Sequence, residues 1–131
     1  MTRRGVFSLL AVIAAVGLAS GAEARELTEL RDRIRDGVQR TDKDFGKVVH
    51  REKLNAQQRE KFDSAVKDLG EIRDAVASGK WQDERERFEK MIDNLDFVTK
   101  NAPISDEDRQ TLGIDVYSLQ VILDSWKPQG K

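Results

Sequence analysis

Few side chains in this chain have the types and spacing that catalysis or cofactor binding requires. The 131 residues include no cysteine and one histidine, His50, and the only methionine after Met1 is Met91. Thiolate chemistry and iron–sulfur clusters are therefore excluded. The ligand sets of zinc and di-iron sites are also missing. His50 follows Val48 and Val49, where a cation would complement a helix C-terminus.

Two further patterns match known sites only in part. The segment DKDFGKVVHRE spaces Asp42 and Asp44 as a calcium loop does. However, Gly46 comes one position early, and Lys53 stands at the twelfth position, where a bidentate Glu is needed. The serines lack a G-x-S-x-G context and a histidine in a suitable local frame. The sequence therefore predicts no catalytic, cofactor-binding or metal-binding residue, and a protein that is not an enzyme.

Residues 1–24 have the features of an export signal. Arg3 and Arg4 supply a positive start, an uncharged apolar stretch follows, and Ala22 and Ala24 offer the small residues that precede a cleavage site. We expect cleavage after Ala24, a periplasmic or secreted protein, and no stable membrane anchor after cleavage. An uncleaved anchor is the alternative, because the apolar run approaches the length of a membrane span. The paired arginines also fit a twin-arginine signal, but the compact, strongly apolar leader favours the general Sec route.

The elements that would position any site are helices. Residues 25–131 show four segments with apolar residues at helical spacing, at about 27–49, 55–77, 81–100 and 105–126. Short connections between them predict an all-α domain, an antiparallel up-down four-helix bundle. Charged residues make up 36% of the chain with a net charge of −1. Because the two signs are interleaved, no concentrated basic face exists for nucleic acid.

Two helix starts in this chain follow the same pattern. Leu54, Asn55 and Gln58 form a capping box behind an apolar residue. A shift of fifty residues places Ile104, Ser105 and Asp108 on those positions and also aligns the later apolar stripes. The pattern predicts two pseudo-repeated helical hairpins. The alternative is coincidence of helical period, since fifty residues are about fourteen turns.

The two starts, LNAQQ and ISDED, resemble the L-T-x-x-Q motif of a family of small periplasmic helical chaperones and envelope-stress sensors. Leu54 and Gln58 match it literally, whereas Asn55 stands for Thr, and the second copy has Ile104, Ser105 and Asp108. The resemblance implies an exported all-helical protein with chaperone-like or stress-sensing activity. It implies no particular binding residue here.

The fourth helical segment is apolar on more than one stripe. Ile114, Tyr117 and Val121 add to a stripe that already includes Leu112 and Leu119. A helix that is apolar all round is either central in the core or covered by a partner. We therefore predict that Ile114, Tyr117 and Val121 form a partner-binding face, with deeper burial of the helix as the alternative.

Glycines inside the expected helices form a separate signal. Gly37, Gly70 and Gly113 each cost up to about 1 kcal/mol relative to alanine. We expect close helix approach or a local bend where they lie.

The sequence thus predicts an exported, non-catalytic helical protein of the bacterial cell envelope. It would act by binding a protein partner or by self-association as a homo-oligomer. A chaperone-like protein similar to the LTxxQ family and a small cofactor- or metal-binding bundle remain as alternatives.

Overall fold

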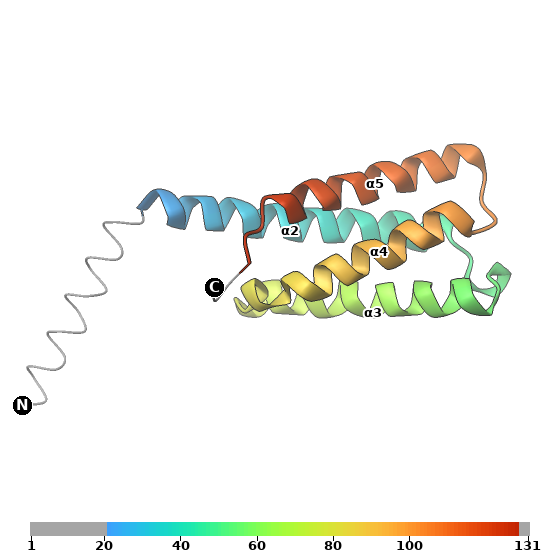
Figure 1. The fold of residues 1–131 in the computed structure, drawn as a ribbon, viewed down its shortest axis with the longest axis horizontal. Helices are drawn as coiled ribbons and strands as arrows, with labels where there is room; N and C mark the ends of the chain where they lie inside the picture. The colour runs from blue at the N-terminus through green and yellow to red at the C-terminus, as the bar shows by residue number, and fades with distance from the viewer. Residues whose placement is uncertain (1–20, 129–131) are drawn as a thin grey trace, which may run out of the picture.

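The computed structural model describes residues 21–128, which form a four-helix bundle without strands (Figure 1). The helices are α2 (Gly21–Val48), α3 (Ala56–Ser78), α4 (Arg85–Asn101) and α5 (Asp106–Asp124). Two short 3₁₀ helices, η1 (Arg51–Lys53) and η2 (Trp81–Glu84), lie in the connections. The predicted all-α bundle is confirmed.

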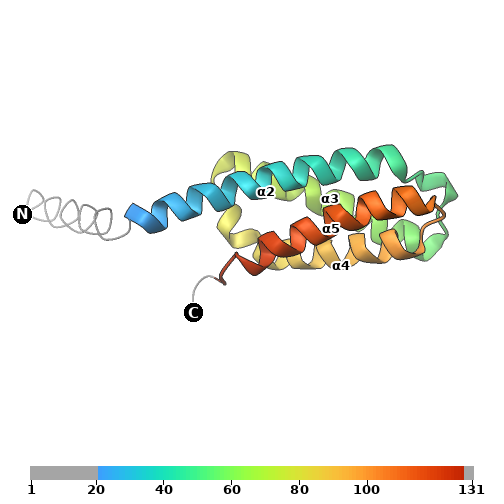
Figure 2. The same ribbon diagram turned by 90° about the horizontal axis from the view of Figure 1, so that it is seen from above.

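The four helices run alternately up and down, and α5 returns beside α2 (Figures 1 and 2). Each helix therefore packs against two neighbours, and α2 and α5 form one antiparallel face of the bundle. The first part of α2 extends past the other helices, and residues 21–29 are exposed. The α2–α5 face is the one that matters for the candidate site.

The helix boundaries differ from the predicted ones mainly at the ends of the bundle. Helix α2 begins at Gly21 instead of 27 and runs through the expected cleavage position. The rest of the predicted leader, residues 1–20, lies outside the described residues. The predicted third helix is divided into η2 and α4, and α5 ends at Asp124, although Trp126 beyond it is still buried.

The paired helix starts have corresponding hydrogen bonds. Asn55 Oδ1 accepts from the Gln58 amide at 2.8 Å, and Ser105 Oγ accepts from the Asp108 amide at 3.0 Å. Only the first start has the full capping box, in which Gln58 Oε1 accepts from the Asn55 amide at 3.1 Å.

An arginine one turn into each helix reaches back to the carbonyl before the cap. Arg59 donates to Leu54 at 3.0 Å, and Arg109 donates to Ile104 at 3.2 Å. The N-termini of α3 and α5 therefore match in their hydrogen bonds as well as in their sequence pattern. Descent from a duplicated hairpin stays a hypothesis.

The core is a single cluster of apolar side chains from all four helices. Three aromatic rings close it at one end, where Trp126 packs against Trp81 at a centroid distance of 5.7 Å and against Phe88 at 5.3 Å. The largest fully buried apolar side chains are Ile34, Val38, Phe45, Leu69, Ile72, Phe88, Met91, Leu95, Val98, Leu112 and Leu119.

Only one of the three predicted glycines lies at a close helix contact. A Cβ at Gly37 would lie 3.0 Å from Ile122 Cδ1 and 3.2 Å from Leu119 Cδ2, so this glycine lets α5 approach α2. A Cβ at Gly113 would meet nothing within 4 Å, and one at Gly70 would make only an ordinary contact with Arg73. Close helix approach is therefore found at Gly37 but not at Gly70 and Gly113, where the alternative of a local bend stays a prediction.

Candidate functional site

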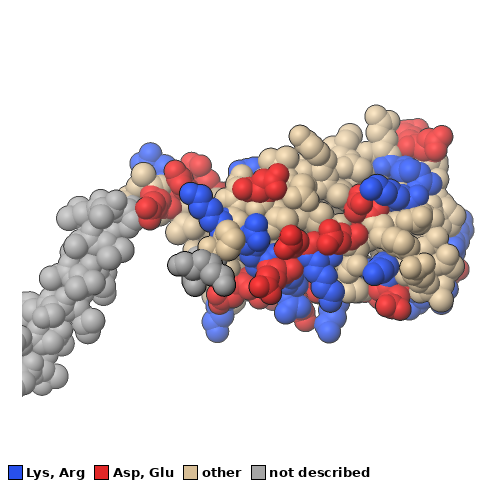
Figure 3. Space-filling model, viewed as in Figure 1, with Lys and Arg blue, Asp and Glu red and all other residues tan. Residues whose placement is uncertain are grey.

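The outer face of α5 has an unusual composition for this highly charged chain. Between Arg109 and Asp124 the only charged residue is Asp115, and it is buried, with 4% of its surface exposed. Figure 3 shows the consequence, because the edge of the molecule along α5 is mostly tan while charged residues gather below it. A helix face without exposed charge is unusual on a soluble bundle and is typical of a surface that a partner covers.

The three residues predicted to form a partner-binding face lie on this outer face. Ile114 is 59% exposed, Tyr117 69% and Val121 37%. Their spacing of three and four residues places them along one side of α5. Deeper burial of the helix, the alternative raised by the sequence, is therefore wrong for these positions. Elsewhere in residues 21–128, the large apolar side chains with comparable exposure are Leu27 and Val66, on α2 and α3.

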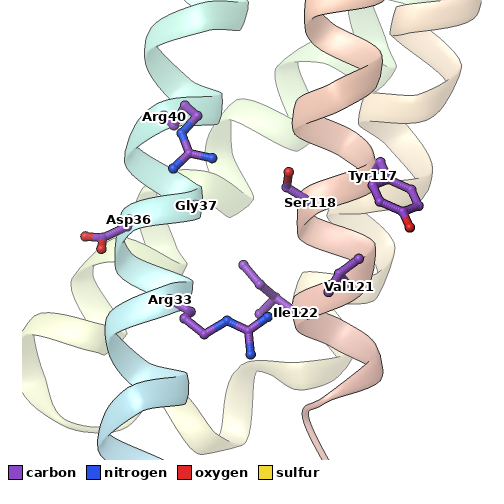
Figure 4. Close-up of a pocket in the computed structure, with 8 residues that line it drawn as sticks. All are labelled: Arg33, Asp36, Gly37, Arg40, Tyr117, Ser118, Val121 and Ile122. Carbon is purple, nitrogen blue, oxygen red and sulfur yellow. The ribbon is translucent and has the colours of Figure 1, made fainter.

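A groove of about 310 Å³ runs between α5 and α2 next to this face. Gly37 and Ile122 form its floor, since the missing side chain at Gly37 leaves room for Ile122 to reach α2. Figure 4 shows the residues that line it, with Ile122 pointing from α5 toward α2. The complete lining consists of Arg33, Asp36, Gly37 and Arg40 from α2 and Tyr117, Ser118, Val121 and Ile122 from α5.

The two arginines of the groove are its main electrostatic feature. The side chains of Arg33 and Arg40 extend toward the space between the helices, whereas Asp36 points away from α5 (Figure 4). Asp36 is paired with Arg35 at 3.2 Å. Among residues 21–128, Arg33 and Arg40 make neither an ion pair nor a hydrogen bond. The α2 side of the groove therefore presents two arginines that form no close ion pair in the described part of the chain, of which Arg40 still interacts electrostatically with Asp115 on α5.

A pair of acidic residues joins the same two helices. Burial, a hydrogen bond with Asp44 on α2 and the like charge of Asp44 together raise the pKa of Asp115 to about 7. Arg40 opposes this rise. Asp115 Oδ2 is buried and has no hydrogen-bond partner among the described residues. The pair can therefore hold one proton between α2 and α5 near neutral pH.

A larger hollow of about 770 Å³ lies at the end of the bundle, near the start of α2. Its lining includes Glu23, which the predicted cleavage after Ala24 would remove, and the buried rings of Trp81 and Trp126. We therefore place the candidate site on the α2–α5 face, which lies wholly beyond the leader.

The residues considered for metal or haem binding do not come together. His50 is exposed after the end of α2, while Met91 is completely buried in α4. Asp42 and Asp44 lie within the helix α2 and not in a loop. No cluster of three or more His, Asp or Glu side chains that could hold a metal ion is found in residues 21–128.

Comparison with known proteins finds no matching family model, no matching curated protein and no matching solved structure. The resemblance to the LTxxQ family therefore stays a prediction from two short motifs. Among the helices of the described part of the chain, none is both long and apolar enough to cross a membrane.

The sequence predicted that Ile114, Tyr117 and Val121 would be exposed, but it did not reveal the groove and the acid pair beside them. Arg33 and Arg40 are seven residues apart, with Gly37 between them, so their shared face could have been read from the sequence. The sequence could not show that these two arginines lack ion-pair partners among the described residues.

Proposed function

We propose that this protein is an exported, non-catalytic component of the bacterial cell envelope that binds a protein partner through the outer face of α5. The observation that carries the proposal is the exposure of Ile114, Tyr117 and Val121 on a face with no exposed charge. The leader pattern in residues 1–24 supports export.

The magnitude of the effect can be estimated from the three side chains. Burying an exposed apolar side chain of this size contributes about 1.5–3 kcal/mol. Aromatic residues at the centre of an interface often account for 2 kcal/mol or more. Since about 1.4 kcal/mol corresponds to a tenfold change in Kd, replacement of all three should weaken binding by at least about 100-fold.

The test compares the mature wild-type protein with the triple variant Ile114→Asn, Tyr117→Ser, Val121→Asn. Each is used as bait on envelope extract from the native host, and bound proteins are quantified by mass spectrometry. A matched control replaces Leu27 and Val66, two exposed apolar residues away from this face, with Ser. Circular dichroism verifies that all variants keep their helical content.

We expect a specific partner to be lost with the triple variant and kept with the control. A partner retained equally by all baits, or no enriched partner at all, would refute the proposal. Sedimentation analysis of the wild-type protein tests self-association separately, since a dimer that the triple variant dissolves would make the partner a second copy.

A further inference from the structure

We infer that the groove between α2 and α5 docks an acidic amphipathic helix of the partner, with carboxylates seven residues apart that pair with Arg33 and Arg40. This inference rests on the proposed function and names the chemistry of the partner. It is carried by two arginines that form neither an ion pair nor a hydrogen bond within residues 21–128, by the apolar side chains of α5 next to the groove, and by the glycine floor between the helices.

The groove has two walls of different chemistry. Val121 and Ile122 form the apolar α5 side of the groove, with the exposed Tyr117 ring at its outer edge and directed away from α2, while Arg33 and Arg40 extend from α2 (Figure 4). A ligand lying in the groove would therefore meet apolar contacts along one side and positive charge along the other. An amphipathic helix presents these two properties on adjacent faces, and docking of such a helix in a groove is a common mode of recognition.

The spacing of the arginines fits a helical ligand. Seven residues correspond to about two turns, so Arg33 and Arg40 share a face of α2 and lie about 10.5 Å apart along its axis. A partner helix lying along α2 repeats the same spacing, and Glu or Asp residues seven apart on it would face both arginines. Arginine and carboxylate groups can form two parallel hydrogen bonds, which also fixes the register of the ligand.

The neighbouring charges distinguish these arginines from others on α2. Arg31 pairs with Asp32 at 3.1 Å, and Arg35 pairs with Asp36 at 3.2 Å. Arg33 and Arg40 have no such partner within residues 21–128 and both line the groove. Arg33, and Arg40 with only the longer-range interaction with Asp115, therefore lie where a ligand would supply carboxylates for direct ion pairs.

Charge complementarity disfavours a dimer in which the α5 helices of two copies face each other. The outer face of α5 has no exposed carboxylate between Arg109 and Asp124, so the α5 helix of a second copy would bring nothing to pair with the arginines. A membrane surface is flat, whereas this site is a groove between two helices. An acidic helix satisfies both the shape and the charge.

The test uses synthetic helical peptides with a leucine stripe as probes. One peptide has two Glu residues seven apart beside the stripe, a second has Gln at the same positions, and a third has Lys. Binding to the mature protein is measured by fluorescence anisotropy. The protein variants are Arg33→Glu with Arg40→Glu, and a matched control, Lys43→Glu with Lys47→Glu. The control makes the same charge change at exposed α2 positions outside the groove.

We expect the Glu peptide to bind best, and the Arg33→Glu, Arg40→Glu variant to weaken it at least tenfold. The same variant should leave the Gln peptide nearly unchanged and improve binding of the Lys peptide. The lysine control should change binding of the Glu peptide less than threefold. Equal binding of all three peptides, or equal loss with the two charge variants, would overturn the inference.

The same variants used as baits on envelope extract separate this inference from the proposed function. If the α5 triple variant loses the partner while the arginine variant keeps it, the inference fails and the proposed function stands. If neither variant loses it, both fail. Two further results overturn the inference: a homodimer that the triple variant dissolves, or arginine-dependent binding to phosphatidylglycerol vesicles without binding to the Glu peptide.

Discussion

The ionisation of Asp115 should control how the stability of this bundle depends on pH. Its carboxyl lies between α5 and α2, and its pKa is raised from an ordinary value of 3.8 to about 7, chiefly because burial disfavours the charged form. The hydrogen bond and the like charge of Asp44 contribute to this rise, while Arg40 acts in the opposite direction. In the unfolded chain none of these neighbours is held in place, so the group returns to its ordinary pKa.

The direction of the effect follows from where the proton is bound. Below about pH 4 both states hold the proton, and Asp115 does not change the stability. Between pH 4 and pH 7 the unfolded chain releases its proton while the folded protein keeps it, which favours unfolding by up to about 1.4 kcal/mol per pH unit. Above pH 7 both states are ionised and the loss levels off.

The magnitude can be tested by replacing Asp115 with Asn. If folded Asp115 kept its proton throughout, the free energy of unfolding would fall by about 2.7 kcal/mol from pH 5 to pH 7. Asp115 begins to ionise in the folded protein near its pKa, which reduces this loss to about 2 kcal/mol. The Asn variant lacks this term, so its stability relative to wild type should rise by about 2 kcal/mol over that range. Urea unfolding followed by circular dichroism from pH 5 to pH 8 measures the difference, in which titrating groups that do not contact Asp115 cancel.

Two further variants make the result specific. Asp44→Asn removes the second and third causes of the raised pKa but not the burial, so it should shorten the pH-dependent range without abolishing it. Asp124→Asn, an exposed acid at the end of the same helix, should follow the wild-type curve. If wild type and Asp115→Asn lose stability in parallel between pH 5 and pH 7, Asp115 is not protonated in the folded protein and the reasoning is wrong.

Two other predictions concern packing and buried charge. Gly113→Ala should raise the free energy of unfolding by about 0.5–1 kcal/mol, because its Cβ would meet nothing within 4 Å. Gly37→Ala should not raise the free energy of unfolding, because its Cβ would lie 3.0 Å from a side chain of α5. Equal stabilisation of the two variants in thermal unfolding would contradict close packing at Gly37. Arg87→Met should cost about 2–3 kcal/mol in urea unfolding, because it leaves the Asp68 carboxylate, 6% exposed, without its cation. A matched Arg73→Met, at an exposed residue with ion pairs of 3.9–4.0 Å, should cost less than about 0.5 kcal/mol, and equal costs would contradict a buried role for Asp68.

The helices and their ends could be predicted because both are local properties of the chain. The spacing of apolar residues determines which side of each helix is buried, whichever element the helix packs against. The caps at Asn55 and Ser105 need only the residue three positions later, and Gly79 needs only its own freedom to adopt a positive φ, observed at 81°. The early start of α2 was missed, because residues 21–26 have no apolar stripe that could mark them as helical.

The charged part of the site could be predicted only partly, because it depends on how two helices are rotated against each other. In the sequence, Arg33 and Arg40 are surrounded by charged residues just as the paired arginines of α2 are. Only the packing of the helices shows that they face α5. Asp115 did leave a signal, since it lies three residues after Leu112 and four before Leu119, within a buried stripe. An acid at such a position needs a partner from another helix, and the sequence cannot say that the partner is Asp44.

Helix α5 departs from the usual arrangement of a bundle helix at both sides, because one acid lies among its buried apolar residues and three apolar residues lie on its outer face. The buried acid costs folding free energy above about pH 4, as argued for Asp115, whereas exposed apolar residues such as Tyr117 add nothing to folding because they remain in water. Solubility would be better served by charge at Ile114, Tyr117 and Val121, as on the other helices. Because these exposed side chains contribute little to the fold and are the kind of surface that a partner would bury, binding at this face is the first property to measure.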